Sequence, residues 1–137
     1  MTIKENIDIS LTSSKDAYDI MQGIYNKHSE QDKTKEHFYI LGLNAKNKIN
    51  YIELVSMGTL TSSLVHPREV FKIAIMKDSA SIIACHNHPS GDVTPSRDDI
   101  NITKRLKEAG AIIGITLLDH LIISGKEYIS LTEKGIV

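Results

Sequence analysis

The chain has 137 residues, of which 41% are hydrophobic, and its 16 Lys and Arg against 17 Asp and Glu give a formal net charge of −1. This composition suits a single soluble domain with one hydrophobic core, spanning residues 1–137, and it excludes a disordered chain. No basic run is present. Avid non-specific nucleic-acid binding needs a cationic surface, so we expect the chain alone to have no nucleic-acid partner.

Compartment is indicated by what the sequence lacks. Cys85 is the only cysteine, so no intramolecular disulfide can form, which favours a reducing compartment. The N-terminus, MTIKENIDIS, has no apolar signal region, and no apolar run approaches the roughly 20 residues that span a bilayer. We therefore expect a cytoplasmic protein without a membrane partner. The oligomeric state is left open.

The first half of the chain predicts one helix and one β-hairpin. Apolar residues recur at three- and four-residue steps over 13–28, the pattern of a helix with one apolar face. The stretches 37–43 and 49–56 flank the turn sequence NAKNK, which predicts a hairpin. We expect residues 1–12 to be extended or irregular and residues 29–36 to form a polar connector.

The second half predicts two helices and four short strands. Gly58 and several small hydroxyl residues indicate a loop at 57–65, and Pro67 suits the first turn of a helix that continues to about Lys77. A further helix is expected over 97–109 with its end at Gly110. The strands are expected at 81–86, 111–118, 120–124 and 127–131. This order predicts an α/β (mixed α+β) fold with a central mixed sheet and about three flanking helices.

The segment with the clearest chemistry is CHNHPSGDVTPSRDDI, residues 85–100. Side chains alternate along a strand, so if the strand reaches His88 both His86 and His88 project from one face and can grip one ion. Asp99, in the first turn of the next helix, could complete a set of two histidines and one carboxylate. Three protein ligands plus water is the pattern of catalytic zinc, and a structural site of the cysteine type is excluded by the cysteine count. Cys85 is expected on the opposite face, as a buried apolar residue.

Each of these residues also has a plainer interpretation. Two histidines at this spacing are often surface residues, and S-x-x-D at 96–99 is also a helix capping box, with Ser96 as the N-cap. A catalytic zinc needs a general base, for which Glu36 and Glu53 are candidates. Glu36 could equally be a solvated charge of the connector, and Glu53 an exposed residue on the polar face of the sheet. The residues alone leave these alternatives open.

The same segment resembles a known family. Residues 86–99, HNHPSGDVTPSRDD, look like the JAMM motif of the MPN+ (Jab) metalloproteases, with Pro89, Ser96 and Asp99 in register. Together with VSMGTLTSSLVHPREVFK at 55–72 and DHLIIS at 119–124, the segment closely resembles the RadC family, from about Lys35 to the C-terminus. The resemblance implies an MPN/Jab, cytidine-deaminase-like architecture.

The resemblance also implies roles for individual residues. His86, His88 and Asp99 resemble ligands of one Zn²⁺ per chain. Glu36 resembles the glutamate that activates the attacking water, and Ser96 resembles the serine that hydrogen-bonds the oxyanion. The implied activity is zinc-dependent cleavage of a peptide or isopeptide bond, with a peptide or protein as substrate.

One departure from the family pattern bears on function. RadC-family proteins carry an N-terminal helix-hairpin-helix segment associated with DNA binding, whereas this sequence has room for one helix before the core. We therefore expect the Jab domain without that segment. A RadC-type DNA-repair or nucleic-acid-associated role is the alternative to hydrolysis, and a metal-free interaction module is a further one, against which the intact ligand set argues.

Overall fold

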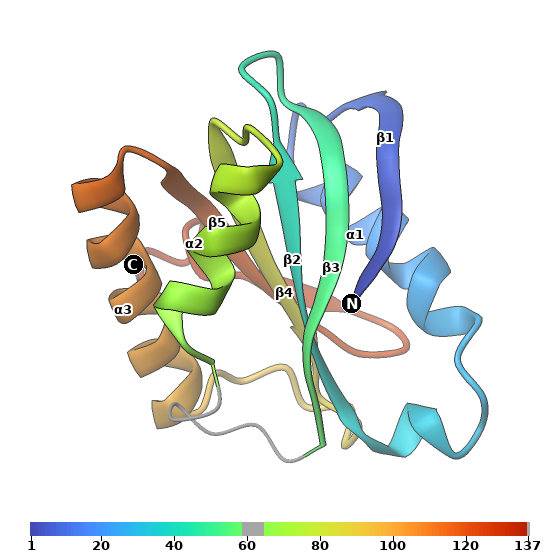
Figure 1. The fold of residues 1–137 in the computed structure, drawn as a ribbon. Helices are drawn as coiled ribbons and strands as arrows, with labels where there is room; N and C mark the ends of the chain where they lie inside the picture. Colours follow the sequence, from blue (N-terminus) through green and yellow to red (C-terminus); the bar gives the residue numbers. More distant parts are fainter. Residues whose placement is uncertain (59–64, 137) are drawn as a thin grey trace.

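The computed structural model describes residues 1–58 and 65–136, and these form one mixed sheet with helices on both faces (Figure 1). The six strands lie in the order β1-β3-β2-β4-β5-β6, and only β4 and β5 are parallel to each other. The elements in chain order are β1 (Thr2–Ser10), α1 (Ser14–Asn26), the short 3-10 helix η1 (Asp32–Thr34), β2 (Glu36–Leu43), β3 (Lys48–Gly58), α2 (Pro67–Met76), β4 (Ser81–Asn87), α3 (Arg97–Ile113), β5 (Thr116–Ile123) and β6 (Tyr128–Ser130).

Helices cover the two faces of the sheet unequally. On one face, α1 buries Ala17, Met21 and Ile24 against the central strands. On the other face, α2 and α3 pack together, with Phe71 and Leu106 in a second apolar cluster. This arrangement of three layers confirms the predicted α/β class with a mixed sheet and three flanking helices.

Several element predictions are confirmed. The hairpin of residues 37–43 and 49–56 is the antiparallel pair β2 and β3. The extended segment expected within residues 1–12 is the edge strand β1, which pairs with β3.

Among the described residues, no helix has the length and apolar character needed to cross a membrane.

The boundary between α3 and β5 was predicted wrongly. Residues 111–113, expected in a strand, continue α3, and a single strand, β5, replaces the two expected at 111–118 and 120–124. An apolar run such as AIIGITLL does not by itself distinguish helix from strand. Gly110 does not end the helix; Gly114 does, in the left-handed conformation that glycine adopts without strain.

The loop expected at 57–65 is only partly testable. Met57 and Gly58 belong to β3, so the prediction is wrong for these two residues. Residues 59–64 lie outside the described residues.

The fold brings the end of β4 to the start of α3. Because side chains alternate along β4, Cys85 enters the core cluster on the α1 face, as predicted, while Ala84 joins the cluster on the α3 face. His86 therefore points toward α3. The loop between β4 and α3 turns the chain so that Asp99, in the first turn of α3, lies 3.0 Å from this histidine.

Candidate metal centre

Three side chains, from β4, from the loop that follows it and from α3, meet at the end of β4. His86 is fully buried near the end of the strand, and His88 follows just beyond it. Asp99 lies in the first turn of α3 and is also buried. His86, His88 and Asp99 could hold a metal ion, since one ligand atom from each lies close to the other two.

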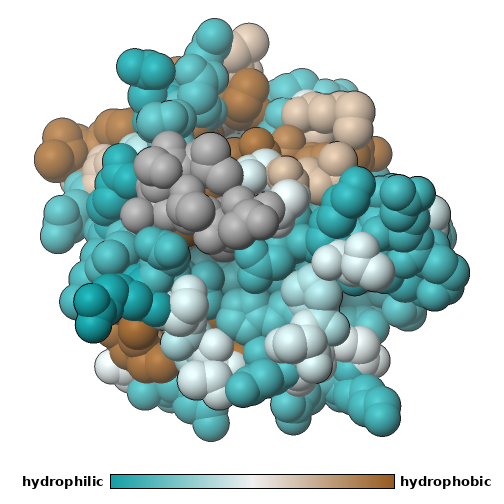
Figure 2. Space-filling model, turned by 90° about the horizontal axis from the view of Figure 1, so that it is seen from below, coloured by the Kyte–Doolittle hydropathy of each residue, from teal (hydrophilic) through white to brown (hydrophobic). Residues whose placement is uncertain are grey.

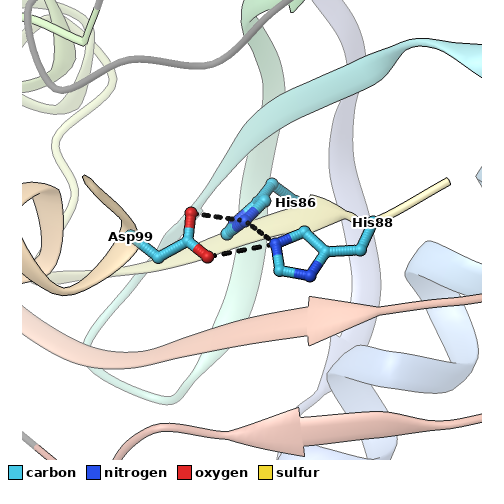
Figure 3. Close-up of side chains that lie close together, drawn as sticks. All are labelled: His86, His88 and Asp99. Carbon is cyan, nitrogen blue, oxygen red and sulfur yellow. Dashed lines mark hydrogen bonds and ion pairs between the residues drawn. The ribbon is translucent and has the colours of Figure 1, made fainter. Parts of the chain in front are cut away.

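The nitrogen and oxygen atoms of these residues point toward one another (Figure 3). His86 Nε2 lies 3.0 Å from Asp99 Oδ1, and His88 Nε2 lies 3.0 Å from Asp99 Oδ2. The two Nε2 atoms are 3.1 Å apart. Two ligand atoms that each lie about 2.0–2.1 Å from one tetrahedral ion are separated by roughly 3.3 Å, so this spacing suits a shared ion.

The protonation of His88 supports the fit to a metal. Its Nδ1 lies 2.7 Å from the backbone carbonyl oxygen of Asp92, which can only accept, so Nδ1 carries the proton. With Nδ1 protonated, Nε2 is the nitrogen of His88 that is left to bind a metal ion. Ligating histidines commonly have the other ring nitrogen held in this way.

The charges of the centre favour a cation. A hydrogen bond to the Asp99 side chain raises the pKa of His88, because the carboxylate stabilises positive charge on the ring. Burial would raise the pKa of Asp99, but its hydrogen bonds with His86 and His88 outweigh burial and hold that pKa below its usual value. The carboxylate is therefore ionised, as a metal ligand must be.

Asp99 is oriented by the helix that it begins. Its backbone N–H donates to Ser96 Oγ at 3.0 Å, and its Oδ2 accepts from the Ser96 backbone N–H at 2.8 Å, which is a complete capping box. The capping interpretation and the ligand interpretation of the S-x-x-D pattern are therefore compatible. The cap fixes the carboxylate in the position that faces the two histidines.

Two residues outside the motif, His120 and Thr103, lie on the Nδ1 side of His86. Its Nδ1 lies 2.7 Å from Nε2 of His120 in β5, and His120 Nδ1 lies 2.5 Å from the hydroxyl oxygen of Thr103 in α3. Phe38 packs against both imidazole rings. Burial lowers the pKa of His120 well below its usual value. The polar pair Asp119–His120 within an apolar strand was the available sequence signal.

A cleft opens beside the centre. It has a volume of about 570 Å³, and His88, Asp99, Ser96 and Glu36 are among the residues that line it. This end of the molecule has a mostly hydrophilic surface (Figure 2). Glu36 also contributes to the raised pKa of His88, although less than Asp99 does. Glu53, the other candidate base, instead accepts a hydrogen bond from the Thr2 hydroxyl of β1 at 2.5 Å.

Comparisons with known proteins agree with these features. The family description "RadC-like JAB domain" matches residues 11–136. A UPF0758 protein of Clostridium beijerinckii is 52% identical over 132 residues, which are 96% of this chain and 56% of that protein. UPF0758 proteins of Clostridium botulinum strain Hall and of Geobacillus kaustophilus are each 60% identical, over 81% and 76% of this chain and 47% and 46% of their own lengths.

These relatives are named without an activity, and the chain spans about half of their length. The family match, in contrast, covers nearly the whole chain, including β4, α3 and β5, which carry the centre. The chain belongs to the RadC-like JAB domain family.

Proposed function

We propose that the chain is a zinc-dependent hydrolase that cleaves a peptide or isopeptide bond. The observation that carries this proposal is the convergence of His86, His88 and Asp99 at a cleft that Glu36 and Ser96 also line. Three protein ligands beside an open cleft leave room for water and a substrate oxygen, which is the arrangement of catalytic zinc sites. Metal ligands, a carboxylate and a hydroxyl within one cleft are the components that amide hydrolysis requires.

Zinc is the metal that we propose. Two imidazoles and one carboxylate are ligands that zinc accepts in catalytic sites, although the same set also suits ferrous iron. When bound, zinc would act as a Lewis acid that makes water more acidic and polarises a carbonyl oxygen. Metal analysis distinguishes zinc from iron directly.

Glu36 is proposed as the general base and then as the general acid. It lines the cleft together with His88 and Asp99 at the beginning of β2. From this position its carboxylate can accept a proton from the attacking water and deliver it to the departing amine. Proton transfer by a positioned carboxylate typically contributes about 10²–10⁴ in rate.

Ser96 is proposed as the donor that stabilises the developing oxyanion. Its Oγ accepts the N–H of Asp99, which uses a lone pair and not the hydroxyl proton. The proton can therefore point into the cleft. A single donor of this kind typically contributes about 2.7–4 kcal/mol to transition-state stabilisation.

The test compares two glutamate variants of the zinc-loaded chain on a library of internally quenched peptides and isopeptides. Glu36→Gln removes the proton acceptor and preserves the shape, so we expect zinc content to stay and cleavage to fall by about 10²–10⁴-fold. Glu53→Gln is the matched control, because Glu53 bonds Thr2 on β1; its cleavage rate should equal that of the wild type. Full activity of Glu36→Gln, or no cleavage of any probe by the wild type, would contradict the proposal.

A further inference from the structure

A series of hydrogen bonds leads from Nδ1 of His86 to the backbone carbonyl oxygen of Asp99, another candidate metal ligand. His86 Nδ1 contacts His120 Nε2 at 2.7 Å, and His120 Nδ1 contacts Thr103 Oγ1 at 2.5 Å. The Thr103 hydroxyl in turn donates to the backbone carbonyl oxygen of Asp99 at 2.6 Å. All four residues are buried. This series of hydrogen bonds therefore links two of the candidate metal ligands through groups that water does not reach.

The Asp99 carbonyl oxygen, at the end of this series of hydrogen bonds, determines which atom donates in each of them. The carbonyl oxygen of Asp99 can only accept, so the single hydroxyl proton of Thr103 must lie on that bond. Thr103 Oγ1 is then an acceptor, and His120 Nδ1 must donate to it. If the Thr103 proton pointed to His120 instead, two oxygen acceptors would face each other at 2.6 Å without a proton.

The position of the proton on the His120 ring then determines the position of the proton on the His86 ring. His120 is fully buried, and its hydrogen-bond partners are a hydroxyl and an imidazole. A charge buried against neutral partners is unfavourable, so the ring is neutral and its single proton is on Nδ1. His120 Nε2 must therefore accept, and His86 Nδ1 must donate. The remaining nitrogen of His86, Nε2, faces Asp99 and His88 and is the one left to bind a metal ion.

We propose that His120 and Thr103 are positioning residues that fix His86 in the tautomer with its proton on Nδ1, so that Nε2 is presented to a metal ion. The proposal rests on the metal site of the proposed function, but it concerns how the ligand is prepared and not which bond is cleaved. For His88, the backbone carbonyl oxygen of Asp92 likewise holds a proton on Nδ1.

The location of His86 explains why it needs a side-chain partner. It lies within β4, between β2 and β5, with Phe38 and Ile122 as its register partners. Backbone carbonyls inside a sheet are engaged in the strand ladders. The parallel register sets Ala84 beside His120, so an imidazole from β5 can reach His86 on the α3 face of the sheet.

Substitutions at position 120 separate the hydrogen bond from the packing. His120→Leu removes the acceptor for His86, and we expect zinc affinity to fall by about 10- to 100-fold, the usual effect of losing such a partner. In His120→Gln the side-chain amide oxygen can reach the position of the imidazole Nε2, so this variant should retain affinity within a few-fold. His120→Asn is the matched control, because its shorter amide reaches Thr103 but not His86, and it should behave like His120→Leu.

Substitutions of Thr103 provide a second, independent pair of variants. Thr103→Val has nearly the same shape but no hydroxyl, so it leaves the His120 proton without its acceptor and should also lower zinc affinity. Thr103→Ser keeps the hydroxyl and should preserve the affinity. Zinc affinity is measured by competition with a chromophoric chelator, and thermal unfolding of each metal-free variant confirms that it is folded before the comparison.

The tautomer itself is read from the ¹⁵N chemical shifts of the imidazoles in the metal-free wild type. We expect a protonated Nδ1 for His86. A proton on His86 Nε2 in place of Nδ1 would overturn the proposal, as would unchanged zinc affinity in folded His120→Leu and Thr103→Val. These results do not depend on cleavage of any substrate, so failure of the proposed hydrolysis remains distinguishable from failure of this inference.

Discussion

Ser96 is the residue at which helix stability and the proposed chemistry meet. Its hydroxyl oxygen caps α3 by accepting the Asp99 N–H, while its backbone N–H holds the Asp99 carboxylate. A change of the side chain removes the first of these bonds and leaves the second in place. The capping contribution can therefore be separated from metal binding.

For Ser96→Ala we predict two effects with unchanged zinc content. Loss of the N-cap should lower the free energy of unfolding by about 0.5–2 kcal/mol. Loss of the proposed oxyanion donor should lower kcat more than it raises KM. Denaturant unfolding and steady-state kinetics measure the two effects separately.

Ser13→Ala is the control for Ser96→Ala, because Ser13 caps α1 by accepting the Asp16 N–H. It should lower stability without changing kcat. If Ser96→Ala loses stability but keeps its kcat, Ser96 is a cap alone.

At the residue scale, the sequence could predict the three candidate ligands because they lie within 14 consecutive residues of one strand–loop–helix segment. Strand alternation and a helix cap are local rules, and together they place His86, His88 and Asp99 near one another. The choice between Glu36 and Glu53 was different. Glu36 lies near the candidate metal centre because β2 pairs antiparallel with β4, which sets the beginning of β2 beside His86, and local spacing does not contain that information.

At the scale of elements, the junction between α3 and β5 shows how tertiary contact overrides local pattern. Gly110 lies inside α3, where the absence of a side chain lets the helix approach the backbone of Ile115. A Cβ atom at this position would lie 2.2 Å from the Ile115 carbonyl oxygen. Ile112, which was expected in a strand, is 88% exposed on the helix.

We therefore predict that Gly110→Ala is destabilising although alanine favours helices. The clash with backbone atoms should outweigh the gain in helix propensity and lower the free energy of unfolding by about 1–3 kcal/mol. Gly23→Ala in α1 is the matched substitution, because nothing lies within 4 Å of a Cβ atom there. It should raise stability by about 0.5–1 kcal/mol. Equal effects of the two substitutions in chemical denaturation would refute this explanation.

The contacts of His120 could also not be predicted from local sequence rules. Its contact with His86 depends on the parallel register of β4 and β5, and its contact with Thr103 depends on how α3 packs on the sheet. The strand sequence DHLIIS contains the polar residues Asp119 and His120 but does not show which residues they contact. Pairing between strands separated by a helix is decided by the whole fold.

At the scale of the whole molecule, the balance of charge argues for one function class over another. The chain has a net charge of −1, and it spans about half the length of its curated relatives. We predict that this chain binds duplex DNA with a dissociation constant no tighter than about 10⁻⁶ M at physiological salt. A binding titration repeated across salt concentrations measures this constant. Nanomolar affinity with a steep salt dependence would instead favour the nucleic-acid-associated role.

The central claim is that His86, His88 and Asp99 hold one zinc ion, and the most direct test is the metal content of the chain purified without added metal. Inductively coupled plasma mass spectrometry should find about one zinc per chain in the wild type and in Glu36→Gln, which keeps all three ligands. His86→Ala, His88→Ala and Asp99→Ala should each lose most of it. Full zinc retention in all three alanine variants would contradict the account.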